Sequence, residues 1–260
     1  MDLSLKGRHA LVCGASRGIG RAAAVALAGL GCEVTALARS ADKLDKTVSV
    51  LREVGCARAR KLVVDLDDRA GLREAVGALV AESPVHILIN NTGGPKPGLL
   101  IEAEEEALLT GFGRHVLAGQ AMVQLCLPGM KAAGYGRIIN VISTSVREPI
   151  PNLGVSNTIR GAMASWSKTL SRELPPGVTI NNILPGYTAT DRLAEIAEAK
   201  AAKAGSDRAA IEEAWRGEVP ERRLGRPEET GAAIAFLASP AAGYIRGVSL
   251  PVDGGRLRSI

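Results

Sequence analysis

Three glycines follow the first apolar run of the chain, and a serine and an arginine stand between the first two of them. The run His9 to Cys13 leads into the spacing Gly-x-x-x-Gly-x-Gly, and an amphipathic pattern comes next. Glycines permit a tight turn and a close approach of the backbone to a ligand, and a helix N-terminus presents free N–H groups to an anion. A strand, a loop and a helix in this order predict a site for the pyrophosphate of a dinucleotide. Its residues are Gly14, Ser16, Arg17, Gly18, Ile19 and Gly20.

The second apolar run indicates which dinucleotide is bound. An acidic residue at the end of that strand would bond the 2′-hydroxyl of NAD, but Val34 to Leu37 is followed by Ala38-Arg39-Ser40. A carboxylate repels a 2′-phosphate, whereas a guanidinium binds it with two hydrogen bonds. Arg39, with Arg17 beside it in the glycine loop, therefore favours NADP(H) over NAD(H) as the cofactor.

Short apolar runs alternate with amphipathic stretches along the whole chain. Runs of about 4–8 residues that are apolar throughout are typical of strands buried on both faces of a parallel sheet. Repeated strand–helix–strand units place helices on both faces. We predict an α/β fold, a single Rossmann-type doubly wound parallel sheet of about seven strands. The clearest strands are His9–Cys13, Glu33–Leu37, Arg60–Val64, Val85–Ile89, Gly136–Ile142 and Val178–Leu184, and the clearest helices are Ile19–Leu30, Ala41–Val54, Arg69–Ala81 and Asn157–Leu174.

The composition is that of a soluble globular protein, with 46% hydrophobic and 23% charged residues in 260. Doubly wound folds of this size form one core, so we expect one domain over residues 1–260. The net charge of +5 is spread without a basic block, which argues against a nucleic-acid partner. No apolar run approaches the roughly 18 residues that span a bilayer, and Met1 to Arg8 lacks the apolar core of a signal peptide. We therefore expect no membrane segment and no export.

The four cysteines stand singly along the chain, and no histidine cluster lies near them. Cys13, Cys32, Cys56 and Cys126 include no Cys-x-x-Cys pair. This spacing predicts neither a disulfide framework nor a metal site, and reduced thiols suit a cytoplasmic protein.

The stretch from Asp191 to Trp215 is helical in pattern and rich in Ala, Glu and Lys, with no strand beside it. Because it directly follows a second loop with the composition of a cofactor site, it suggests a mobile substrate lid over about residues 190–217. A plain surface helix is the alternative, and we favour the lid.

These motifs, taken in order, resemble the short-chain dehydrogenase/reductase family over nearly the whole chain, and in particular its 3-oxoacyl-acyl-carrier-protein-reductase-like branch. The resemblance implies that Asp65 and Leu66 meet the adenine ring. It also implies that Asn90-Asn91-Thr92-Gly93 stabilises the sheet, with Asn91 and Gly93 along the cofactor. The loop that would hold the nicotinamide carboxamide contains Pro185, Gly186, Thr188 and Thr190.

The catalytic pattern of that family is broken in this chain. Its reductases use a serine, a tyrosine 13 residues later, a lysine four residues after that, and an asparagine on an earlier helix. Counting along the matching helices places Ser143, Ser156, Arg160 and His115 at these positions, so only the first serine is kept. A serine hydroxyl is a far weaker acid than tyrosine, and arginine titrates above about 12 and does not normally release its proton. Ser156 and Arg160 can hold a carbonyl or a carboxylate, but they cannot repeat the tyrosine–lysine mechanism.

Two other side chains are candidate proton donors. His115 has an ordinary pKa near 6.5, which suits a general acid, although a lone helical histidine is more often structural. Tyr187 directly follows Pro185-Gly186 and would lie on the nicotinamide side of the pocket.

Three functions from different classes remain open at this point. The leading one is an NADP(H)-dependent oxidoreductase with an altered proton donor, acting on a small molecule or an acyl thioester. The second is a catalytically silent NADP(H)-binding or regulatory protein, and the third is non-redox chemistry such as dehydration or isomerisation with His115 and Ser143. The resemblance also implies a homo-oligomer, a tetramer or a dimer. It would form through the helices near Leu108–Leu125 and Asn157–Leu170 and through the C-terminal strand.

Overall fold

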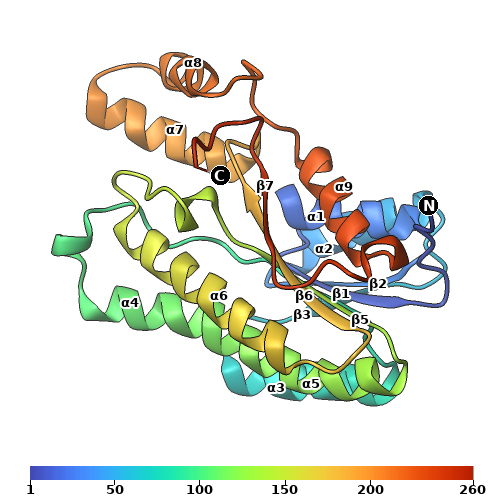
Figure 1. Cartoon of the computed structure of the whole chain (residues 1–260). Coiled ribbons are helices and arrows are strands. Elements are labelled where there is room, and N and C mark those ends of the chain that lie inside the picture. Colours follow the sequence, from blue (N-terminus) through green and yellow to red (C-terminus); the bar gives the residue numbers. More distant parts are fainter. Residues whose placement is uncertain (260) are drawn as a thin grey trace.

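One sheet of seven parallel strands runs through the middle of the molecule (Figure 1). The computed structural model describes residues 1–259, and Ile260, the last residue of the predicted domain, lies outside them. The strand order is β3-β2-β1-β4-β5-β6-β7, so the chain moves outward from β1 in one direction and then, from β4, in the other. The strands are β1 His9–Cys13, β2 Glu33–Ala38, β3 Ala59–Val63, β4 Ile87–Asn90, β5 Gly136–Val141, β6 Val178–Pro185 and β7 Ser249–Val252.

The central strands form where the sequence is mainly apolar. Every residue of β1, β4 and β5 is buried, as expected for strands covered on both faces. The sequence prediction of β1 is confirmed to the residue, and the other five predicted strands lie within two residues of their observed bounds.

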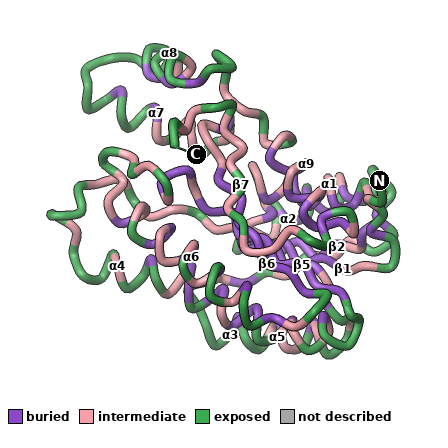
Figure 2. The backbone as a smooth tube through the Cα atoms, viewed as in Figure 1, coloured by how far each residue is buried: buried purple, intermediate pink, exposed green. Residues whose placement is uncertain are grey.

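Helices cover both faces of the sheet and bury two separate apolar cores (Figure 2). One face is covered by α1 (Gly18–Gly29), α2 (Ala41–Glu53) and α9 (Pro227–Ala238). The other face is covered by α3 (Arg69–Glu82), α5 (Ala118–Ala132) and α6 (Gly154–Glu173), with α4 (Glu105–Phe112) beside α6. The α/β architecture predicted from the sequence is thus the observed one.

A helical hairpin lies apart from these layers, above the carboxyl ends of the strands (Figure 1). It consists of α7 (Asp191–Ala204) and α8 (Arg208–Glu218), and Gly205, with φ +62°, forms the turn after α7. The hairpin has a small core of its own, in which Ala197, Ala201, Ile211 and Trp215 are buried against each other.

No helix within residues 1–259 combines the length and the apolar character that crossing a membrane would require. In the same part of the chain, no group of three or more His, Cys, Asp or Glu side chains is arranged to hold a metal ion.

Candidate functional site

A cleft of about 510 Å³ opens at the carboxyl ends of β1, β4, β5 and β6. The strand order reverses between β1 and β4, and a doubly wound sheet binds its ligands at such a point because the loops on either side turn away from each other. The glycine loop forms one wall of this cleft, and α7 reaches over it with Thr190, Asp191, Arg192 and Ile196.

The glycine loop has a backbone that only glycine fits well. Gly14 and Gly18 have φ values of +62° and +55°, in the left-handed region. A Cβ atom on Gly20 would lie 2.3 Å from the carbonyl oxygen of Gly14. Asn91, which follows β4, fixes the loop from below, since its Nδ2 donates to the carbonyl oxygens of Cys13 at 3.3 Å and Gly14 at 3.4 Å. The loop is therefore tightly closed against the start of α1.

The first turn of α1 leaves its N–H groups available to an anion. Arg17 occupies the N-cap position without a side-chain hydrogen bond to the turn, and the first turn contains no acidic residue. Helix N-termini of this kind attract phosphate through the free N–H groups and the helix dipole. The residues present fit the pyrophosphate of a dinucleotide.

The end of the cleft beside β2 carries basic side chains, as the position of Arg39 in the sequence indicated. Arg39 follows β2, and its Nη1 lies 3.6 Å from Oδ2 of Asp65, which follows β3. Lys43, one turn further along α2, also lines the cleft. Sequence reasoning missed Lys43, although a second cation four residues after Arg39 was a visible signal. Arg17 does not point to this end, because its guanidinium pairs with α7.

Ser143, Ser156 and Arg160 come together in the cleft, on the side away from Arg39. Ser143 lies two residues after the end of β5, at the N-cap of a short 3-10 turn, and Ser156 and Arg160 lie one turn apart on α6. A Cβ atom on Gly94 would lie 3.9 Å from Oγ of Ser156 and 3.8 Å from Nη2 of Arg160, so both side chains face the same point of the loop after β4. The three residues that the spacing argument grouped together thus line one cleft.

Arg160 is a buried cation whose hydrogen bonds all go to the main chain. Its Nη1 donates to the carbonyl oxygen of Val141 at 2.9 Å and its Nη2 to that of Thr92 at 3.3 Å, and the residue is 7% exposed. Among residues 1–259, no carboxylate forms an ion pair with it. Burial lowers the pKa of Arg160 to about 10, which still leaves it charged at neutral pH. The group can stabilise negative charge but does not supply a proton.

The geometry around His115, one of the two candidate proton donors, does not favour a role as general acid. His115 lies in a single π-helical turn, Gly113–Leu117, between α4 and α5, and it is 4% exposed. Burial, together with the charges of Arg160 and Arg114, lowers the pKa of His115 to about 2. Its Nε2 has no partner within the described residues, and the residue lines, together with Arg160, a cavity of only about 10 Å³. The ring is therefore neutral at physiological pH and set behind the cleft.

The structure also corrects the placement of Tyr187. Its hydroxyl donates to Oε2 of Glu218 on α8 at 2.8 Å, and its ring stacks on Trp215 with 5.0 Å between the centroids. Burial, followed by the bond to Glu218, raises the pKa of Tyr187 to about 12. Tyr187 belongs to the contact between the hairpin and the sheet, and it is not among the described residues that line the cleft.

Most of the other sequence-predicted residues line the cleft. Gly20 and Thr188 do not, because Gly20 is packed beneath the loop and Thr188 donates to the carbonyl oxygen of Gly186 at 3.3 Å. Thr190 lines the cleft and also caps α7, since its Oγ1 accepts from the N–H of Leu193. The predicted residues that do line it are Gly14, Ser16, Arg17, Gly18, Ile19, Arg39, Asp65, Leu66, Asn91, Gly93, Pro185, Gly186 and Thr190.

A ladder of amides holds the strands beneath the cleft in register. Nδ2 of Asn90 donates to Oδ1 of Asn140 at 2.8 Å, and Nδ2 of Asn140 donates to Oδ1 of Asn182 at 2.9 Å. Nδ2 of Asn182 then donates to Oγ of Ser249 at 3.1 Å, and all four residues are register partners on β4 to β7. The sequence prediction that the Asn90-Asn91 segment stabilises the sheet is consistent with this geometry.

Comparison with known proteins agrees with the fold. The family model described as Enoyl-(Acyl carrier protein) reductase matches residues 14–256. The 3-oxoacyl-[acyl-carrier-protein] reductase FabG of Pseudomonas aeruginosa is 32% identical over 99% of this chain and 100% of its own length. The NADPH-dependent reductase BacG of Bacillus subtilis is 31% identical over 97% of this chain and 99% of its own length. A crystal structure of L-sorbose reductase from Gluconobacter frateurii, complexed with NADPH and L-sorbose, superposes with a TM-score of 0.94 at 30% identity, covering 100% of both chains.

Proposed function

The chain belongs to the short-chain dehydrogenase/reductase family, in its 3-oxoacyl-[acyl-carrier-protein]-reductase-like branch, and from this premise we propose an NADP(H)-dependent oxidoreductase with an altered active site. It acts on a C=O or CH–OH group of a small molecule or an acyl thioester, without the tyrosine–lysine pair of its relatives' pattern. Ser156 and Arg160 stand at those two positions.

The cofactor assignment rests on the charge and shape of the cleft. The closed glycine loop and the uncapped start of α1 suit a pyrophosphate, and Arg39 with Lys43 suits a 2′-phosphate. The relatives and neighbours named for NADPH support the same choice.

One observation carries the proposed chemistry: Ser143, Ser156 and Arg160 line the same cleft as the glycine loop. When bound, NADPH supplies the hydride. The two hydroxyls hold the substrate oxygen by hydrogen bonds, and the fixed positive charge of Arg160 stabilises the negative charge that develops on that oxygen. No tyrosine, histidine or cysteine is found among the described residues that line the cleft, and we propose that the proton comes from water.

The test is NADPH binding by the pure protein, followed in the same cuvette by loss of NADPH absorbance with a panel of substrates. The panel contains 3-oxoacyl thioesters, keto sugars, quinones, and 2-oxo acids alongside their neutral analogues. Because Arg160 is a buried cation, we expect turnover with faster reaction of the substrates that carry a carboxylate near the reacting carbon. Equal rates with charged and neutral analogues would remove that preference from the proposal.

Two variants locate the chemistry. Ser143→Ala should lower the turnover number about 10- to 1000-fold, because it removes one donor to the developing oxyanion. Restoring the family pair with Ser156→Tyr and Arg160→Lys together should raise it, by supplying a general acid. Binding of NADPH without turnover, and without gain in the restored variant, would favour a catalytically silent NADP(H)-binding protein. Product formed with no change in NADPH would favour non-redox chemistry.

We also propose a homo-oligomer, a tetramer or a dimer, in the cytoplasm. Leu109, Phe112 and Leu117, on or directly after α4, expose between 40% and 57% of their surface. The edge strand β7 adds Leu250, with Tyr244 fully exposed nearby. All four cysteines are free and buried, which suits a reducing compartment. Sedimentation velocity over a range of protein concentrations gives the assembly directly.

A further inference from the structure

The first turn of α7 reaches both walls of the cleft. On one side Cγ2 of Thr190 lies 3.2 Å from the position that a Cβ atom on Gly18 would take, so the helix start rests on the glycine loop. On the other side Nη2 of Arg192 donates to the carbonyl oxygen of Pro95 at 3.3 Å. A molecule entering the cleft from above must pass these contacts.

Arg17 ties the glycine loop to the same turn. Its Nη1 lies 3.2 Å from Oδ2 of Asp191 and 3.3 Å from Oε1 of Glu195, both on α7. The Arg17 side chain is 45% exposed, and the carboxylates are 69% and 47% exposed. Ion pairs this exposed are weak and exchange readily for another anion.

The α7–α8 hairpin has an apolar core of its own. Its buried residues Ala197, Ala201, Ile211 and Trp215 pack on each other, and outside the two helices the apolar contacts of this cluster are with Tyr187 and Leu224. Toward the glycine loop and Pro95, by contrast, the links are polar: two carboxylates on Arg17 and one guanidinium on a carbonyl oxygen. Releasing these polar links leaves the small core of the hairpin intact.

We propose that the two carboxylates of α7 and the phosphate groups of the cofactor compete for Arg17, so that cofactor binding and the seating of the hairpin are coupled through this one guanidinium. This rests on the proposed NADP(H) binding at the glycine loop. Asp191 and Glu195 would lie beside the phosphates if they kept Arg17, and like charges at such a distance repel. Binding therefore transfers Arg17 from the carboxylates to a phosphate and loosens the hairpin. By linkage, a hairpin whose carboxylates are paired with Arg17 raises the Kd for the cofactor by the same factor by which the bound cofactor weakens this pairing.

The competition predicts that removing either carboxylate strengthens cofactor binding. Asp191→Asn and Glu195→Gln should each lower the Kd for NADPH about two- to fivefold, the range that exposed ion pairs permit. In an Arg17→Gln background the same substitutions should change the Kd much less, since no guanidinium remains to be released. Fluorescence titration of NADPH measures the Kd of each variant and of the two backgrounds. Glu198→Gln is the matched control, because it removes the same charge from α7 at a residue that pairs with Arg208 instead.

The hairpin supplies an independent readout that needs no cofactor. Hydrogen exchange in the first turn of α7, residues 191–195, should be faster in Arg17→Gln and in the Asp191→Asn, Glu195→Gln double variant than in the wild type. Glu198→Gln should leave exchange in this turn unchanged, because Glu198 pairs with Arg208 at the start of α8. Unchanged or weaker NADPH binding after carboxylate removal would overturn the competition, as would equal gains with and without Arg17. Failure of the wild-type protein to bind NADPH would instead refute the proposed function, so the two failures are distinguishable.

Discussion

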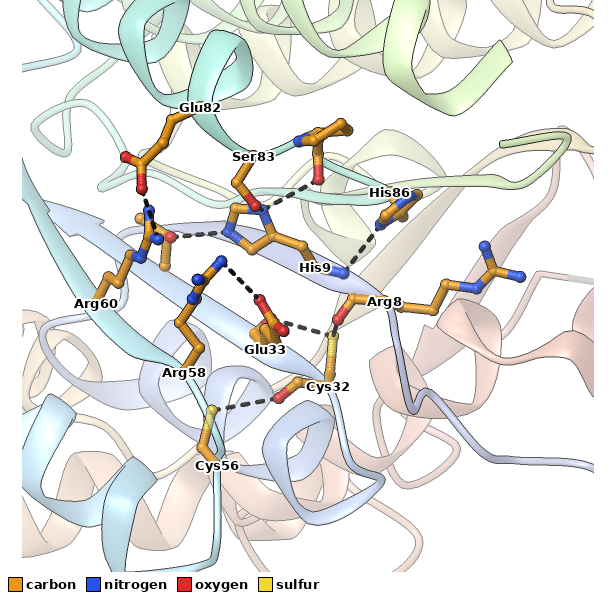
Figure 3. A network of polar contacts seen from close by, with 12 residues as sticks. Arg8, His9, Cys32, Glu33, Cys56, Arg58, Arg60, Glu82, Ser83 and His86 are labelled. Carbon is orange, nitrogen blue, oxygen red and sulfur yellow. Dashed lines mark hydrogen bonds and ion pairs between the residues drawn. The ribbon is translucent and has the colours of Figure 1, made fainter. Parts of the chain in front are cut away.

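The amino ends of the parallel strands form one edge of the sheet, the amino edge, and their carboxyl ends form the opposite one, the carboxyl edge. The two edges carry similar polar residues, but their hydrogen bonding differs. At the amino edge, the ring nitrogens of His9 are bonded to Oγ1 of Thr35 at 2.9 Å and to the carbonyl oxygen of Pro84 at 3.1 Å (Figure 3). Arg60 pairs with Glu82 at 2.8 Å in the same network. At the carboxyl edge, Nε2 of His115 and Oδ1 of Asn90 have no partner within residues 1–259. Arg160 there binds only carbonyl oxygens.

This difference separates residues that stabilise the protein from residues that serve a ligand. A buried polar group without a partner costs free energy, so a fold keeps such groups where function uses them. At the amino edge, the ring nitrogens of His9 and the guanidinium of Arg60 are hydrogen-bonded within their own network. The carboxyl edge concentrates charge and incomplete hydrogen bonding around one cleft. Substitutions at matched positions on the two edges should therefore affect different measurements.

The largest contrast is expected between two glycines. Gly20→Ala places a methyl group 2.3 Å from the carbonyl oxygen of Gly14 and 2.6 Å from Nδ2 of Asn91, so the glycine loop cannot keep its shape. We expect NADPH affinity to fall by at least about 100-fold, measured by titration. At the amino edge Gly31 also has a positive φ, +88°, but the nearest atom is the flexible Cγ of Lys6. Gly31→Ala should cost about 1–2 kcal/mol of stability in urea unfolding and leave the Kd of the folded protein unchanged. Loss of NADPH binding in Gly31→Ala would break the contrast.

The sequence predicted the elements of this comparison better than it predicted the partners of individual side chains. The strands follow from continuous apolar runs and the loop from its glycines, because both signals are local. The burial of His115 depends on a π-helical turn, and the orientation of Tyr187 depends on where α8 packs. The pairing of Arg17 with Asp191 joins residues 174 positions apart. Such contacts arise from tertiary packing, which no local pattern contains.

The amide ladder should give the next largest effect. Asn140→Ala leaves Nδ2 of Asn90 and Oδ1 of Asn182 buried without their shared partner. Each orphaned group costs about 1–3 kcal/mol, so we expect the free energy of unfolding to fall by roughly 3 kcal/mol. At the amino edge Thr35→Val keeps the shape and removes one hydrogen bond, that to Nε2 of His9, at a cost of about 1 kcal/mol. Equal losses in the two variants would mean that the ladder contributes no more than a single hydrogen bond.

Acid should weaken the fold through buried histidines on both edges, and more through His115 than through His9. Burial lowers the pKa values of His9 and His115 in the folded state, that of His115 to about 2. Below pH ~6.5 the unfolded chain binds protons that the folded chain does not, so stability falls as pH falls, by up to about 1.4 kcal/mol per pH unit for each such group. His115→Asn should flatten the curve of unfolding free energy between about pH 7 and about pH 5. His9→Asn should flatten it less, because hydrogen bonds to the backbone of Pro84 and Ser83 oppose the effect of burial. A steeper curve in His115→Asn would contradict the neutral state assigned to this ring.

The smallest expected effect concerns two arginines at opposite ends of β2, whose removal should change cofactor preference in one case and not in the other. Arg39 lies 3.6 Å from Asp65 beyond the carboxyl end of β2, and Arg58 lies 3.7 Å from Glu33 at its amino end. Both are more than half exposed, so neither ion pair contributes much stability. Arg39→Ala should reduce the preference for NADPH over NADH about tenfold, because a guanidinium is lost from the 2′-phosphate, while Arg58→Ala should change neither Kd. If Arg39→Ala weakens the binding of NADH as much as that of NADPH, Arg39 contacts a part of the cofactor that both nucleotides share. The 2′-phosphate would then be assigned to Lys43, which lines the same end of the cleft.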